Sequence, residues 1–211
     1  HGSSNRGLGC KHRRFGFGLT RRNATAETAS NAAMPDINQS AEWLEADGLG
    51  GYASGTVGTL RTRRYHGIRV TAATPPTGRV VLVAGIDVAF DGGQGPEALS
   101  AQRYEPGVTH PQIAAIESFA LSPWPTWRYR LANGAQVWAE ILCTSERART
   151  LLCWTHVGSS PVARLRVRPL LASRDYHSMQ HENAGVRTTA GVDGACVTWR
   201  LYDGAPEVTC V

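Results

Sequence analysis

The chain has 211 residues, of which 42% are hydrophobic and 18% are charged. This length suits one ordinary domain or one large all-β domain, and the apolar share is enough to bury a core, which excludes a wholly disordered protein. The formal net charge of +5 lies in residues 1–33, and the neutral remainder lacks the basic patch of a nucleic-acid-binding domain, so we expect no nucleic-acid partner.

Residues 1–40 are predicted to form a disordered or variable basic tail. They are rich in Gly, Arg, Asn, Ser, Thr and Ala, and they show no apolar period that would offset the entropy of ordering. The sequence contains neither an apolar stretch of the signal-peptide kind nor a run of about 20 apolar residues, the length of a membrane helix. We therefore expect a cytoplasmic protein with no membrane partner.

The five cysteines are an odd set without Cys-X-X-Cys spacing. Without that spacing the sequence does not predict a zinc site. Because five is an odd number, a complete set of disulfides would need a thiol from a partner. We expect free thiols, no metal and no cofactor.

From residue 41 to residue 211 the hydrophobic pattern has a period of two, which is typical of β-strands. Trp127, Tyr129 and Leu131 alternate with arginines, and Asn133-Gly134 then predicts a two-residue hairpin turn, because both residues tolerate positive φ. A return strand is expected at residues 137–143.

Residues 163–168 alternate apolar side chains with arginines, which predicts a strand half buried in an antiparallel sheet. Further strands are predicted at residues 150–157 and 196–202, and the alternation is still present at residues 208–211. Short strands separated by turns favour an all-β antiparallel β-sandwich over a βαβ fold.

Two segments carry the side chains that a sugar site needs. In the first, residues 48–55 hold four glycines, and Arg63-Arg64-Tyr65-His66-Gly67 follows. No Gly-Lys-Ser/Thr completes a phosphate loop, so the glycines favour a structural turn. Aromatic rings pack on the C–H faces of sugars while Arg and His bond to hydroxyl groups, but a solvated arginine turn is an equal alternative. The candidate sugar- or interface-facing residues here are Tyr52, Arg64, Tyr65 and His66.

The second segment, residues 174–183, contains Arg174, Asp175, Tyr176 and His177. His177 and His181 are four residues apart, but the surroundings indicate strand and loop, and no third metal ligand is evident. An interface or a carbohydrate-facing edge is the favoured interpretation. Glycoside hydrolysis needs two carboxylates flanking the scissile bond, and nothing in the sequence pairs any two, so no catalytic residue is predicted. Trp124 and Trp127 are candidates either for sugar stacking or for the core.

Several longer motifs follow one another in order: Trp43-Leu44, residues 48–56, 63–67, 104–108, 125–129 and 168–171, and Arg174-Asp175-Tyr176-His177. Together they resemble the opening of bacterial and archaeal glycogen debranching enzymes. The resemblance extends over roughly 170 residues, from about Glu42 to the end. It implies a β-sandwich of the supersandwich-like kind that precedes a glucoamylase-type (α/α)6 toroid, which holds the general acid and base.

The resemblance implies that residues 41–211 are an accessory, non-catalytic domain of an enzyme that hydrolyses α-1,6 branch points in glycogen-like α-glucans. Its expected partners are α-glucan, either glycogen or maltooligosaccharides, and the C-terminal (α/α)6 catalytic domain. The alternatives are a stand-alone carbohydrate-binding module and a 4-α-glucanotransferase domain. The chain departs from the expected pattern at Asp47, where an amide residue is expected.

Overall fold

The computed structural model describes residues 37–104, 107–146, 148–159 and 163–211, so nearly all of the predicted tail, residues 1–40, lies outside the described residues. The described part contains strands and turns, with no helix. None of it is a helix long and apolar enough to cross a membrane. The fifteen strands are β1 (Glu42–Ala46), β2 (Tyr52–Thr56), β3 (Gly67–Thr74), β4 (Thr77–Asp91), β5 (Pro96–Ala98), β6 (Gln102–Tyr104), β7 (Val108–His110), β8 (Ala115–Ala120), β9 (Thr126–Arg130), β10 (Gln136–Thr144), β11 (Arg149–Val157), β12 (Arg164–Asp175), β13 (Ala190–Asp193), β14 (Cys196–Trp199) and β15 (Val208–Cys210).

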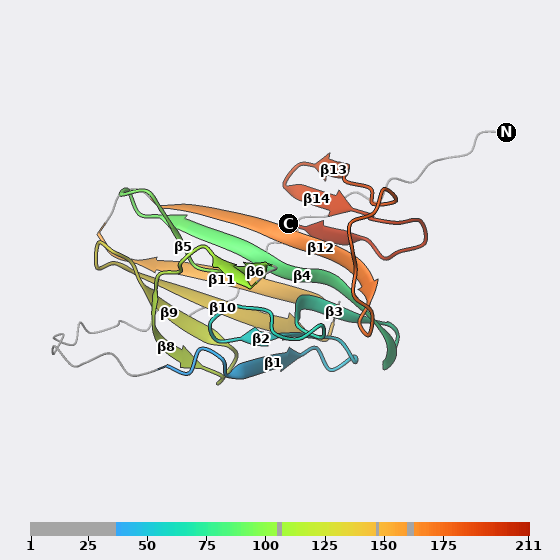
Figure 1. Cartoon of the computed structure of the whole chain (residues 1–211), viewed down its shortest axis with the longest axis horizontal. Coiled ribbons are helices and arrows are strands. Elements are labelled where there is room, and N and C mark those ends of the chain that lie inside the picture. The colour runs from blue at the N-terminus through green and yellow to red at the C-terminus, as the bar shows by residue number, and fades with distance from the viewer. Residues whose placement is uncertain (1–36, 105–106, 147, 160–162) are drawn as a thin grey trace.

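Two antiparallel sheets stack face to face, which confirms the predicted all-β sandwich (Figure 1). The first sheet has the strand order β1-β2-β3-β4-β12, with β5 added along β4, and the second sheet has the order β11-β10-β9-β8. A smaller C-terminal sheet, β13-β14-β15, packs against the first sheet through Val208, which belongs to one buried apolar cluster with Leu82 and Val83. Strands β6 and β7 form a separate hairpin.

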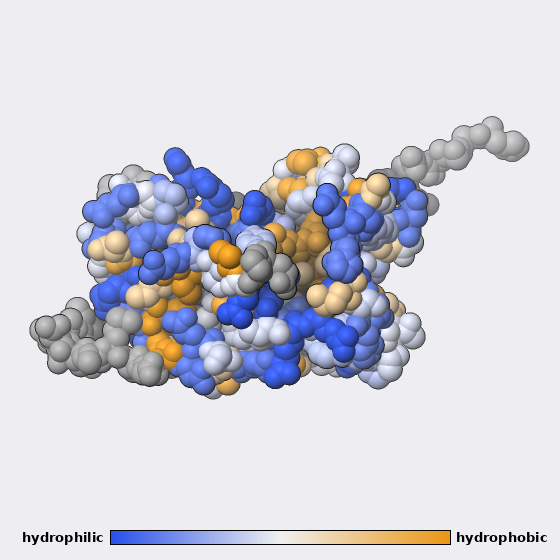
Figure 2. Space-filling view, viewed as in Figure 1, coloured by the Kyte–Doolittle hydropathy of each residue, from blue (hydrophilic) through white to orange (hydrophobic). Residues whose placement is uncertain are grey.

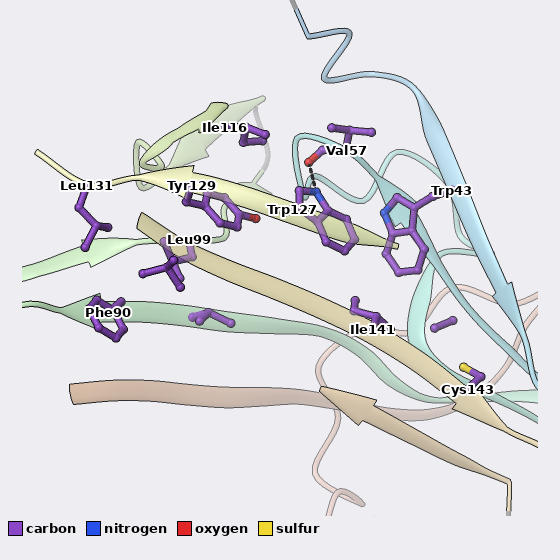
Figure 3. Close-up of a cluster of buried hydrophobic side chains, with 13 residues drawn as sticks. Trp43, Val57, Phe90, Leu99, Ile116, Trp127, Tyr129, Leu131, Ile141 and Cys143 are labelled. Atoms are coloured by element: carbon purple, nitrogen blue, oxygen red, sulfur yellow. Dashed lines mark hydrogen bonds between the residues drawn. The ribbon is translucent and has the colours of Figure 1, made fainter. Parts of the chain in front are cut away.

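The main core lies between the two sheets and is built from the alternating apolar residues of facing strands. Trp43 from β1 and Trp127 from β9 meet edge to face, with ring centroids 5.3 Å apart (Figure 3). The Nε1 of Trp127 donates a hydrogen bond of 2.9 Å to the carbonyl of Val57, so its polar atom is satisfied inside the core. Trp127 is therefore a core residue.

The hairpin predicted at Asn133-Gly134 joins β9 to β10, but the two-residue turn was wrong. The N–H of Leu131 bonds to the carbonyl of Ala135, and the N–H of Gly134 bonds to the carbonyl of Leu131. The loop therefore has three residues, and within it Gly134 alone has a positive φ, of 83°. This is the pattern of a type I turn followed by a glycine bulge, in which one residue rather than two needs the left-handed conformation.

The predicted strand at residues 163–168 is present as the first half of β12, but its predicted half-burial was wrong. Leu165 and Val167 lie opposite Phe90 and Val88 of β4, and both are 38% exposed. The reason is the position of β12: Phe90 of β4 already lies against His156 of β11, the edge strand of the second sheet, and β12 lies beyond β4 at the edge of the first sheet. The first half of β12 therefore extends past the edge of the second sheet.

Candidate functional site

The glycine-rich segment between β1 and β2 is a turn organised by the carboxylate of Asp47. Its Oδ1 accepts hydrogen bonds from the N–H groups of Leu49 and Gly51, at 2.8 and 2.9 Å, and its Oδ2 lies 3.0 Å from Nη2 of the buried Arg69. Gly50 has a φ of +91°, and a Cβ at this position would lie 2.7 Å from the carbonyl oxygen of Pro76. The turn thus needs glycine for its own packing.

Seven of the eight predicted site residues meet at one end of the first sheet. Tyr52 on β2 donates a hydrogen bond of 3.0 Å from its hydroxyl to the carbonyl of Tyr65, which precedes β3. The ring of Tyr65 lies 5.2 Å from that of Tyr176, which follows β12. We call this group the arginine–tyrosine cluster; its members are Tyr52, Arg64, Tyr65, Arg79, Arg174, Asp175, Tyr176 and His177.

Arg174 holds the cluster together through backbone carbonyl groups. Its Nη1 donates to the carbonyls of Asp175, Tyr176 and Ser178, at 3.2, 3.5 and 2.7 Å, and its Nη2 donates to the carbonyl of Arg64. Burial lowers the pKa of this guanidinium. The register of β12 against β4 shifts between Leu171 and Arg174, and such a β-bulge re-aims the side chains that follow it.

The loop after Arg174 places the polar groups of the cluster at the surface. Oδ1 of Asp175 accepts the N–H of His177 at 2.8 Å, and Arg64 donates from Nη1 to the carbonyl of His177 at 3.0 Å. Nδ1 of His177 and the hydroxyl of Tyr65 share a hydrogen bond of 3.3 Å. Arg64, Asp175 and His177 are exposed, whereas Tyr65 and Tyr176 are partly buried.

Arg79 belongs to the cluster, although the sequence analysis does not single it out. Its Nε donates a hydrogen bond of 2.7 Å to the carbonyl of Gly50, and its guanidinium lies 5.7 Å from the ring centroid of Tyr176. Arg79 lies in β4 and Tyr176 far along the chain, after β12, so no local spacing signals the contact. Only the pairing of β4 with β12 brings the two residues together.

His66 is the predicted site residue that the structure does not bring to the cluster. It is buried, its Nδ1 accepts a hydrogen bond of 3.2 Å from the N–H of Thr62, and its Nε2 lies 3.4 Å from Oε1 of Glu42. Burial lowers its pKa, against the opposing effect of Glu42. These contacts tie β1 to the turn before β3, which is a structural role.

Between the sheets lies a cavity of about 70 Å³, separate from the arginine–tyrosine cluster. Its walls are largely apolar and include Trp43, Trp127 and Trp154, while Arg61 and Gln102 contribute polar atoms. Within the described residues, no group of three or more His, Cys, Asp and Glu side chains is arranged to hold a metal ion.

Residues 41–211 match the family described as glycogen debranching enzyme N terminal. The chain belongs to this family. The matched range of this glycogen debranching enzyme N-terminal domain includes all the described strands and every residue of the arginine–tyrosine cluster. No curated protein and no solved structure matches the chain.

Proposed function

We propose that this chain is an accessory, non-catalytic domain of a glycogen debranching enzyme, and that it supports the binding of α-glucan and packs against an (α/α)6 catalytic domain. The observation that carries the proposal is the arginine–tyrosine cluster: motif residues from β2, from the turn before β3 and from the end of β12 converge on one surface. The convergence lies inside the region that matches the family.

The chemistry of the cluster favours recognition of hydroxyl groups over stacking on a sugar face. The ring of Tyr176 already contacts His177, Tyr65 and Arg79, with His177 at 4.0 Å between ring centroids. The exposed polar groups are the guanidinium of Arg64, the carboxylate of Asp175 and the imidazole of His177. Such planar donors and acceptors bind sugar hydroxyls with defined direction.

The same cluster supports a non-catalytic role for this chain. Hydrolysis of a glycosidic bond needs two carboxyl groups on either side of that bond. Asp175 is the acid of the cluster, and Arg174 and Arg64, rather than a second carboxylate, lie next to it. This composition suits holding a glucan chain, with the two acids supplied by the catalytic domain.

Packing on a catalytic domain is supported by apolar surface that the sandwich leaves uncovered. Leu165 and Val167 of β12 are exposed, and β12 is the edge strand of the first sheet, where it pairs along one side with β4. Apolar surface also gathers in a hollow beside the C-terminal sheet, bordered by hydrophilic side chains (Figure 2). Contiguous apolar surface of this kind marks contact sites between domains.

The test is binding of maltoheptaose and glycogen to the full 211-residue chain, by NMR titration and affinity electrophoresis. We expect weak, saturable binding that Arg64→Gln reduces, while the matched control Arg187→Gln, in an exposed ion pair with Asp203, leaves it unchanged. The chain alone is expected to neither hydrolyse nor redistribute maltooligosaccharides.

Two results would contradict the proposal. Binding that is absent, or equally affected by Arg187→Gln, would remove the role in glucan binding. Redistribution of chain lengths by the isolated chain, lost in Asp175→Asn, would instead establish the glucanotransferase alternative.

A further inference from the structure

Three arginines of the arginine–tyrosine cluster, and Arg61 near it, have no carboxylate partner among the described residues. In the described part of the chain, no carboxylate oxygen lies within 4.0 Å of Arg61, Arg64, Arg79 or Arg174, and the same holds for Arg103, Arg128, Arg149, Arg164 and Arg166 on other strands, whereas six arginines form such pairs. The paired arginines are Arg63, Arg69, Arg130, Arg168, Arg187 and Arg200.

Arg61 lies close enough to the cluster for its charge to lower the pKa of Arg174, after the larger effect of burial. Asp175 is the acid next to Arg174, and one of its oxygens already accepts the N–H of His177. Asp87 is the acid near Arg61, but its carboxylate is already paired with Arg168. The end of the first sheet therefore carries an excess of positive charge, although residues 34–211 are neutral as a whole.

Three of these guanidinium groups have hydrogen-bond donors left over. Arg79 uses Nε on the carbonyl of Gly50, Arg61 uses Nε on the side chain of Gln102, and Arg64 uses Nη1 on the carbonyl of His177. Among the described residues, the remaining terminal nitrogens of these three side chains have no hydrogen-bond partner. Arg174 differs, because its terminal nitrogens are occupied by carbonyl groups and position the loop.

We propose that this surface binds a phosphate monoester carried on glucose or on an α-glucan chain. The inference rests on the proposed role in glucan binding and specifies the chemistry of the ligand. Arginine forks match the oxygens of a phosphate group, and hydrogen bonds between two charged groups are about twice as strong as neutral ones. A neutral sugar would leave the excess positive charge unbalanced, whereas a phosphate group is close to dianionic at neutral pH.

The experiment titrates the full 211-residue chain with glucose 6-phosphate, glucose, inorganic phosphate, maltoheptaose and phosphorylated maltooligosaccharides, followed by amide chemical shifts. We expect each phosphorylated sugar to bind about tenfold or more tightly than its neutral counterpart, with affinity falling as salt rises. Shifts are expected at Tyr65, Tyr176 and their neighbours.

Arg64→Gln and Arg79→Gln are expected to remove most of the preference for the phosphorylated sugar. Arg79→Lys keeps the positive charge but loses the hydrogen bond from Nε to the carbonyl of Gly50. It is expected to retain part of the preference, so it separates the effect of the charge from the effect of that hydrogen bond. Arg187→Gln and Arg200→Gln, in exposed ion pairs near the C-terminal sheet, are the matched controls and should leave the preference unchanged.

Three outcomes would overturn the inference. The first is equal affinity for phosphorylated and neutral sugars, and the second is an equal loss of the preference for phosphorylated sugar in the control variants. The third is inorganic phosphate binding as tightly as the sugar phosphates, which would assign the site to free phosphate. Its failure is distinguishable from failure of the proposed function. Binding of maltoheptaose without any gain from phosphate refutes this inference alone, and binding of phosphorylated sugars without neutral glucan refutes the proposed role in neutral glucan binding alone.

Discussion

Asp47 and Arg69 form an ion pair of 3.0 Å in which the side chains are 1% and 9% exposed. The same carboxylate accepts two backbone N–H groups of the glycine-rich turn, so one side chain links that turn to β3. Nη1 of Arg69 is buried without a hydrogen-bond partner, which leaves Asp47 as the main balance for the buried positive charge. An amide residue at position 47, as the family resemblance leads one to expect, would not supply that balance.

Asp47→Asn is therefore expected to destabilise the fold by about 3 kcal/mol, because removing one partner of a buried ion pair leaves an uncompensated charge. The amide oxygen can still accept the turn N–H groups, so the charge is the main loss. Urea unfolding measures the change. The control is Asp203→Asn, whose exposed pair with Arg187 is expected to contribute less than about 1 kcal/mol. Equal effects of the two variants would show that the buried charge is already balanced in another way.

The free energy of unfolding is expected to fall as the pH drops below about 6.5, because His66 is buried near Glu42. Burial lowers the pKa of His66, so the unfolded chain binds more protons than the folded one between the folded and unfolded pKa values, and protonation favours unfolding. The stabilisation from neutral His66 is complete above the unfolded pKa and is lost as the pH falls through the folded pKa. The free-energy cost of His66→Gln should consequently be larger at pH 7.5 than at pH 5.5.

Chemical denaturation of both proteins at the two pH values provides the measurement. His181→Gln, at an exposed histidine, serves as the control and should show no such dependence. A cost of His66→Gln that grows at pH 5.5 would mean that attraction between protonated His66 and Glu42 outweighs burial.

Arg174→Lys is expected to loosen the arginine–tyrosine cluster while keeping its charge. A lysine ammonium cannot reproduce the planar guanidinium that reaches the carbonyls of Arg64 and Ser178 together. We expect a loss of about 1–2 kcal/mol in the free energy of unfolding and a weaker near-ultraviolet circular dichroism signal from Tyr65 and Tyr176.

Arg166→Lys, at an exposed position on the same strand, is the control and should change stability by less than about 0.5 kcal/mol. If both variants behave alike, Arg174 acts only through its charge.

Local pattern was sufficient to predict much of the sandwich. The strands around Trp127 and Ile141 and the hairpin between them are confirmed, because alternation of apolar residues and a glycine turn are local properties. The type of that turn was wrong, since backbone twist and hydrogen bonding at Leu131 and Ala135 decide between two and three residues. His66 shows the same limit for the site: its neighbours in sequence join the cluster, while its own side chain turns to Glu42.

The sequence by itself determined the strand periodicity and the family, and it named as site candidates seven residues that the fold brings into the arginine–tyrosine cluster, because each is written in short motifs. Tertiary structure alone decided which faces are covered and which distant charges become neighbours. Leu165 and Val167 alternate like core residues yet stay exposed, because burial depends on how many strands the opposite sheet contains. Arg79 meets Tyr176 through pairing of strands that are remote in sequence, which no local pattern encodes.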